Sequence, residues 1–142
     1  GACDVVADRI EAGTFAAAAA CLPRSELLLG PVVPAHMAAA VGALRAVGCD
    51  VEVLPSGSEM RVASPARLRP TNIRTEPFPG FPTDLQPQLT SVLALADGSS
   101  TIQETVFEGR LRHAGELRRM GADVLECSDS FLLITGRSLP QT

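Results

Sequence analysis

The sequence predicts an α/β fold built from two βαβαββ units, and three observations support this prediction. The segment "LRAVGCDVEV" from Leu44 recurs as "LRRMGADVLE" from Leu117, 73 residues later, with Leu, Arg, Gly, Asp and Val in register. In both copies, short apolar segments of strand length alternate with longer helical segments. The chain has 142 residues, which suffice for one well-packed core but not for two. We therefore expect both copies to share a single domain, residues 1–142.

The first copy, about residues 3–66, is expected to contain every element of the unit. "CDVVA" (residues 3–7) predicts a strand, residues 10–21 a buried helix and "ELLLG" a second strand. Pro34 opens a second predicted helix, "PAHMAAAVGALRAVG". "CDVEVLPSGSEMRVAS" then alternates around a Pro-Ser-Gly-Ser turn, which is typical of a hairpin.

The second copy, about residues 71–137, repeats this order. "TNIRTE" predicts a strand, residues 84–96 a helix, "STIQETV" a strand, "LRHAGELRRMG" a helix and "ADVLECSDSFLLITG" a hairpin. The 73-residue shift also aligns Glu11 with Asp84. Strands that alternate with helices favour right-handed crossovers with helices packed on a sheet. The proline-rich residues 64–82 between the copies predict an ordered, extended connection.

Composition excludes several classes of function. All 12 basic residues are arginines and the net charge is −4, so a lysine nucleophile within this chain is excluded and a nucleic-acid surface is disfavoured. The longest apolar run, "FAAAAACL", is far shorter than the roughly 20 residues of a membrane span. The N-terminus lacks a basic region followed by an apolar one, so no signal peptide is expected.

The cysteine pattern indicates neither a metal site nor a disulfide framework. The four cysteines form no CxxC pair and no histidine stands at metal-ligand spacing. We expect buried, reduced thiols in a cytoplasmic protein, and no cofactor. The cysteines are Cys3, Cys21, Cys49 and Cys127.

Three long motifs carry a resemblance to a known family. They are "ADRIEAGTF", "NIRTEPFPGFPTDLQPQ" and "ETVFEGRLRHAGELRRMGADV", and the similarity extends over about residues 3–136. In this order and spacing they resemble the enolpyruvyl transferase family, and within it the UDP-N-acetylglucosamine 1-carboxyvinyltransferases. The related enolpyruvylshikimate phosphate synthases share the architecture, but they would not explain the "FPTDLQ" and "ETVFE" motifs.

The resemblance implies an inside-out barrel of βαβαββ units, with helices inside and sheets outside. The family has three such units in each of two domains, so this chain would supply two of six units and be a fragment. The resemblance implies transfer of the enolpyruvyl group of phosphoenolpyruvate to the 3-hydroxyl of UDP-N-acetylglucosamine, in peptidoglycan precursor synthesis. The isolated chain is expected to be inactive. Its expected partners are the missing domain or a second copy of the chain, and neither nucleic acid nor a membrane.

The resemblance also assigns candidate site residues. Enolpyruvyl transfer needs an acid and a base at the reacting centre and cations for the phosphates. Asp84 matches the family acid that meets the sugar hydroxyl and transfers a proton, and Thr83 stands beside it as a substrate-binding candidate. Val106 and Phe107 match residues that line the sugar-nucleotide pocket, although a Val-Phe pair that ends a strand is more often part of a core. Arg110 matches an arginine near the phosphate region.

The loop of Arg110 departs from the family pattern. Gly109 stands where an asparagine is usual, and the added backbone freedom leaves the orientation of Arg110 open. Asp8, Arg9 and Glu11 match the family too, with an expected supporting role, and Asp8 fits an ordinary helix cap. Two histidines near predicted helix starts are expected to lie on the surface: His36 and His113.

The start of the helix after "PGFPTDLQPQ" admits two registers. Thr83 could cap it in a Thr-x-x-Gln capping box, or Asp84 could cap it so that Pro87 falls at a tolerated position. A cap contributes typically ~1 kcal/mol, which alone would explain the acid. Two other functions stay open: a non-catalytic structural or binding module, possibly self-associating, and a related transferase with another acceptor.

Overall fold

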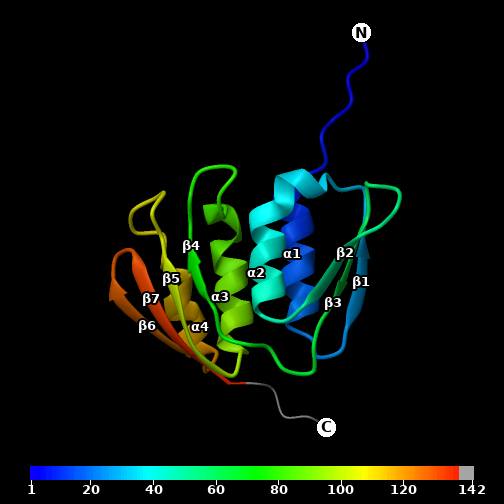
Figure 1. Ribbon diagram of the computed structural model, residues 1–142. Coiled ribbons are helices and arrows are strands. Elements are labelled where there is room, and N and C mark those ends of the chain that lie inside the picture. Colours follow the sequence, from blue (N-terminus) through cyan, green and yellow to red (C-terminus); the bar gives the residue numbers. More distant parts are fainter. Residues whose placement is uncertain (138–142) are drawn as a thin grey trace.

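The computed structural model describes residues 1–137 and shows helices between two sheets (Figure 1). One sheet has three strands in the order β1-β3-β2, and the other has four in the order β4-β5-β7-β6. Helices α1, α2 and α3 lie between the sheets. The predicted α/β class is confirmed, with helices inside and sheets outside. Among the described residues, no helix is long and apolar enough to cross a membrane.

The first copy lacks one predicted strand. Its elements are α1 (Arg9–Ala20), β1 (Glu26–Leu29), the 3₁₀ helix η1 (Pro34–Met37), α2 (Ala38–Ala46), β2 (Asp50–Val53) and β3 (Met60–Ala63). The strand expected at residues 3–7 is wrong. Val5 and Val6 are 92% and 63% exposed, so this segment buries no apolar face against a neighbouring strand. In the repeat register it corresponds to residues 76–80, which also form no strand.

The second copy contains the whole predicted unit. Its elements are β4 (Asn72–Arg74), the 3₁₀ helix η2 (Thr83–Leu85), α3 (Gln86–Ala94), β5 (Gly98–Gln103), α4 (His113–Arg119), β6 (Asp123–Ser128) and β7 (Phe131–Gly136). β4 pairs in parallel with β5, with α3 as the crossover between them. β7 pairs antiparallel with both β5 and β6. The parallel pair brings the ends of β4 and β5 to the same edge of the sheet.

Neither predicted cap of the second copy is used as one. α3 begins at Gln86 with Leu85 as its N-cap, which places Pro87 at the second helical position, where its missing N–H costs no hydrogen bond. No side chain caps η2, whose own N-cap is Pro82. The side chains of Thr83 and Asp84 are therefore available for other contacts.

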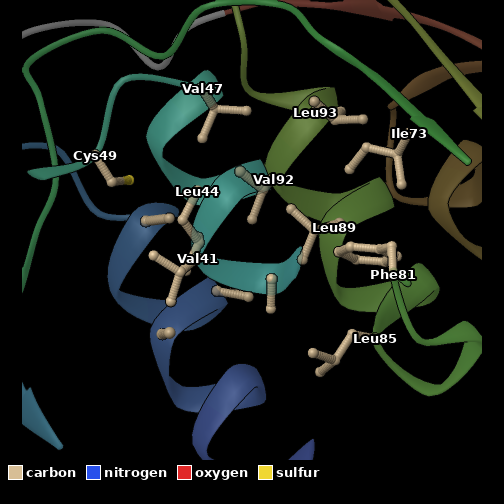
Figure 2. Packing of buried hydrophobic residues seen from close by; sticks show 14 of the residues in the cluster. Val41, Leu44, Val47, Cys49, Ile73, Phe81, Leu85, Leu89, Val92 and Leu93 are labelled. Carbon is tan, nitrogen blue, oxygen red and sulfur yellow. The ribbon is translucent and has the colours of Figure 1, made fainter. Parts of the chain in front are cut away.

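The buried core draws on both copies of the unit. Leu44 from α2 and Leu89 from α3 belong to one cluster of buried apolar side chains, which Figure 2 shows between the helices. Gly13 lets α1 approach the turn before α3 closely, because a Cβ there would lie 2.5 Å from Cδ1 of Leu85. The helices of the two copies thus pack directly on each other.

The prediction that the four cysteine thiols are buried is correct for only some of them. Cys49 is buried, whereas Cys3 and Cys127 are exposed. Burial raises the pKa of the Cys49 thiol to about 11, and Cys21 adds to the shift. Burial also raises the pKa of Cys21. A raised pKa disfavours the thiolate, which is the reactive form, so these two thiols are suited to packing and not to nucleophilic chemistry.

Candidate functional site

The five predicted site residues lie on two segments that meet at one edge of the second sheet. Thr83 and Asp84 lie in η2, and the other three follow β5 in residues 104–112. Both segments rise at the same end of the molecule, where β4 and β5 end (Figure 1). Hydrogen bonds link the segments directly: Thr83 donates to Glu104, and Arg110 donates to Thr83 and Asp84.

Arg110 joins the two segments through its guanidinium group. Its Nη2 donates to Oδ1 of Asp84 at 2.7 Å, and its Nη1 donates to Oγ1 of Thr83 at 3.2 Å. The guanidinium also lies over the ring of Phe107, 5.3 Å from the ring centroid. The Asp84 side chain is 55% exposed and that of Arg110 36%. An ion pair this exposed adds little to stability, typically ~0–1 kcal/mol. Because both side chains are partly exposed, both charged groups are accessible to a ligand.

Glu104 is a buried carboxylate beneath this ion pair. The residue is 3% exposed and accepts four hydrogen bonds. Burial by itself raises the pKa of Glu104, but the bonds from the Val106 N–H, Thr75, Thr83 and the Phe107 N–H outweigh it, so the pKa lies below its usual value. Glu104 is therefore a carboxylate at neutral pH.

Sequence reasoning missed Glu104, although "ETVFE" contains it. The available signal was an acid inside the predicted strand "STIQETV", two and three residues before the candidates Val106 and Phe107. Spacing could not show that this acid is buried while the next one, Glu108, is exposed.

Phe107 and Val106 present side chains beside the ion pair while their backbone binds Glu104. The N–H groups of Val106 and Phe107 donate to Oε1 of Glu104 at 2.9 and 3.1 Å. The Phe107 residue is 56% exposed, and Val106 is half-buried. The alternative that this pair belongs to the core is wrong for Phe107. An exposed aromatic ring next to a carboxylate and a guanidinium suits a ligand with both a flat apolar face and polar groups.

The glycine before Arg110 fits its position. Gly109 has φ +65°, in the left-handed region that glycine adopts without cost and that asparagine tolerates best among other residues. Gly109 therefore fits this backbone shape, as would the asparagine that the resemblance implies, and both hydrogen bonds of Arg110 define its orientation.

The remaining candidates have supporting positions. Asp8 caps α1, as expected, with Oδ1 accepting from Ile10 N at 2.7 Å. Arg9 lies over the ring of Phe78, 4.9 Å from its centroid. His36 is exposed, but the surface expectation is wrong for His113, which is half-buried with Nε2 3.2 Å from Oγ1 of Thr90. Burial lowers the pKa of His113.

Comparison with known proteins agrees with this fold. A sequence model of the EPSP synthase family (3-phosphoshikimate 1-carboxyvinyltransferase) matches residues 1–142. The chain therefore belongs to this family of enolpyruvyl transferases, and the predicted family resemblance is confirmed.

Within the family, the chain is similar to UDP-N-acetylglucosamine 1-carboxyvinyltransferases. A UDP-N-acetylglucosamine 1-carboxyvinyltransferase from Gloeobacter violaceus is 52% identical over 120 residues, which cover 84% of this chain and 26% of the relative. A UDP-N-acetylglucosamine 1-carboxyvinyltransferase 2 from Prochlorococcus marinus is 46% identical over 138 residues, which cover 97% of this chain and 32% of the relative. The chain thus spans about a third or less of the relatives it matches.

Solved structures share the fold. The enolpyruvyl transferase NikO from Streptomyces tendae superposes with a TM-score of 0.81 at 26% identity, covering 97% of this chain and 32% of NikO. EPSP synthase from Acinetobacter baumannii superposes with a TM-score of 0.70 at 20% identity, covering 95% of this chain and 32% of that protein. The second similarity concerns the fold alone.

Proposed function

We propose that this chain is part of an enolpyruvyl transferase that moves the enolpyruvyl group of phosphoenolpyruvate to the 3-hydroxyl of UDP-N-acetylglucosamine. The product would be a precursor of peptidoglycan. The observation that carries the proposal is the exposed carboxylate of Asp84, which Arg110 holds at 2.7 Å beside the exposed ring of Phe107.

The geometry of Asp84 suits proton transfer with the acceptor hydroxyl. Arg110 donates to Oδ1, while Oδ2 accepts no hydrogen bond from the residues that the structure describes. A general base must come within hydrogen-bond reach of the proton it takes. In our proposal Oδ2 faces the acceptor hydroxyl, and the ion pair with Arg110 keeps the carboxylate in one orientation.

Phe107, Val106 and Arg110 support a sugar nucleotide as the acceptor. In the proposal Phe107 and Val106 contact the nucleotide or sugar, and Arg110 contributes positive charge near a phosphate. We choose UDP-N-acetylglucosamine over a shikimate phosphate as the acceptor because relatives at 46–52% identity are named UDP-N-acetylglucosamine 1-carboxyvinyltransferases. The second acidic or basic group and the other phosphate-binding cations would come from units outside this chain, so the chain alone should be inactive.

Phosphate release from phosphoenolpyruvate, measured with the complete polypeptide that contains this chain, tests the proposal. Asp84→Asn keeps the shape of the side chain and removes its proton transfer, so we expect turnover with UDP-N-acetylglucosamine to fall by roughly 100-fold or more. Asp123→Asn is the matched control, because it makes the same change at an exposed acid at the opposite end of the second sheet from the site. It should leave turnover unchanged.

Three outcomes would contradict the proposal in different ways. Full activity of the Asp84→Asn variant would overturn the site assignment. Faster turnover with shikimate 3-phosphate would overturn the acceptor. No turnover by the unaltered complete polypeptide would favour a non-catalytic module instead.

A further inference from the structure

We infer that Glu104 is the positioning residue of this site: it fixes the hydroxyl of Thr83, which in turn orients Arg110 against Asp84. The inference deepens the proposed function of Asp84 and rests on it. Glu104 touches neither the ion pair nor open solvent, so it would act through Thr83 and the loop and not on a substrate.

The two oxygens of Glu104 bind two different parts of the site. Oε1 accepts from Oγ1 of Thr75 at 2.8 Å and from the Val106 and Phe107 N–H groups, which ties the loop after β5 to the end of β4. Oε2 accepts from Oγ1 of Thr83 at 2.8 Å, which ties the same carboxylate to η2. One side chain therefore sets the distance between the two segments that carry the candidate site.

The hydroxyl of Thr83 transmits this constraint to Arg110. A hydroxyl has one proton to donate and lone pairs that accept. Because Thr83 donates its proton to Glu104, its lone pairs face Nη1 of Arg110, 3.2 Å away. The guanidinium is then held at two points, by Thr83 through Nη1 and by Asp84 through Nη2. Without Glu104 the hydroxyl could rotate, and one of these two points would be lost.

Burial separates the fixed part of the network from its open part. Thr75, Thr83 and Glu104 are 0%, 8% and 3% exposed, so water cannot readily replace their hydrogen bonds. The side chains of Asp84 and Arg110 are 55% and 36% exposed. The buried hydrogen bonds hold Asp84 and Arg110 on their inner side, and the outer side of both groups stays accessible to a substrate. A preorganised site requires this combination.

The first copy shows that the fold does not need this network. Under the 73-residue shift, Ile10 replaces Thr83, Pro31 replaces Glu104 and Met37 replaces Arg110. None of these side chains can form the same hydrogen bonds. The first copy nevertheless forms the equivalent helix, strand, helix and hairpin. The network in the second copy is therefore an addition to the unit and not a condition for folding it.

The Nε–H NMR signal of Arg110 in the 142-residue chain tests the inference. Glu104→Gln and Thr83→Val should each broaden this signal and speed its exchange with water by roughly tenfold, because the guanidinium loses a fixed point. The double variant should show no larger effect than Glu104→Gln alone, since Glu104 acts through Thr83. Thr83→Ser keeps the hydroxyl and should restore the original signal.

The matched control is Glu108→Gln, which removes the same charge from an exposed acid in the same loop. It should leave the Arg110 signal unchanged. In the complete polypeptide, Glu104→Gln and Thr83→Val should lower kcat by about tenfold or more, because misplacement of about 1 Å is enough for such losses. KM should change less than kcat.

An unchanged Arg110 signal in folded Glu104→Gln and Thr83→Val would overturn the inference and leave these residues a structural role only. If Glu104→Gln does not fold, Glu104→Asp replaces it, because the shorter carboxylate keeps the charge but cannot bind both Thr75 and Thr83 in the same way. The NMR readout needs no turnover. If the complete polypeptide shows no transferase activity but the Arg110 signal changes in the variants as expected, the proposed function is refuted and the positioning role of Glu104 is not.

Discussion

The two copies of the repeated unit start their first helices in different ways. In the first copy Asp8 caps α1, accepting from the Ile10 and Glu11 N–H groups. The equivalent residue in the second copy is Phe81, which is buried, and no side chain caps η2. There the turn is held by the bond from Thr83 to Glu104. A local cap in one copy thus corresponds to a long-range network in the other, and only the network orients exposed polar groups.

The copies also differ where they touch each other. Ala12 and Gly13 in α1 correspond to Leu85 and Gln86 in the second copy. Leu85 fills the space that Gly13 leaves on α1, so a small residue in one copy complements a large one in the other. Both copies have the same order of elements, but their side chains at this contact are complementary and not identical.

The largest expected stability effect comes from making the copies alike at this contact. Leu85→Ala gives the second copy the residue of the first and should lower the free energy of unfolding by about 3 kcal/mol, because Leu85 is 1% exposed and a cavity would remain. Urea unfolding of the 142-residue chain followed by circular dichroism would measure it. Phe15→Ala, which removes a side chain that is 55% exposed, should cost less than about 0.5 kcal/mol. Equal losses would contradict a specific packing role for Leu85.

A smaller effect should separate the local cap from the network. Asp8→Ala removes the cap of α1 and should cost about 1 kcal/mol. Asp4→Ala, in the exposed segment before α1, is the matched control for the loss of one acid. Thermal unfolding of both variants would test the difference. If the two variants were equally stable, the cap would contribute nothing measurable and α1 would depend on packing alone.

The smallest effect is a pH dependence that belongs to the second copy. Because the folded pKa of Glu104 is lowered, its contribution to stability is complete above the pKa of a glutamate in the unfolded chain, about 4.3. That contribution is lost as the pH falls through the folded pKa, where Glu104 takes up a proton. The stability difference between the unaltered chain and Glu104→Gln should therefore be present at pH 7 and shrink below about pH 4.

Thermal unfolding between pH 7 and pH 3 would measure this difference. The remaining acids are the same in both proteins, so their contributions largely cancel in the comparison. A difference that stays constant with pH would show that the charge of Glu104 does not stabilise the fold.

The sequence by itself determined the repeat, the order of the elements in the second copy and the family. These depend on spacing along the chain: apolar periodicity, glycine and proline positions, and long motifs. The cap at Asp8 was also predictable, because its partners lie two and three residues away.

Only the tertiary structure decided which local signals are used. Residues 3–7 alternate like a strand but have no neighbouring strand to pair with, and Thr83 and Asp84 satisfy a capping rule but bind partners 21 and 26 residues away. Glu104 and Glu108 look alike in sequence, yet one is buried among four donors and the other faces solvent. The physical reason is the same in each case: burial and long-range hydrogen bonds depend on what the rest of the chain places nearby, which spacing does not encode.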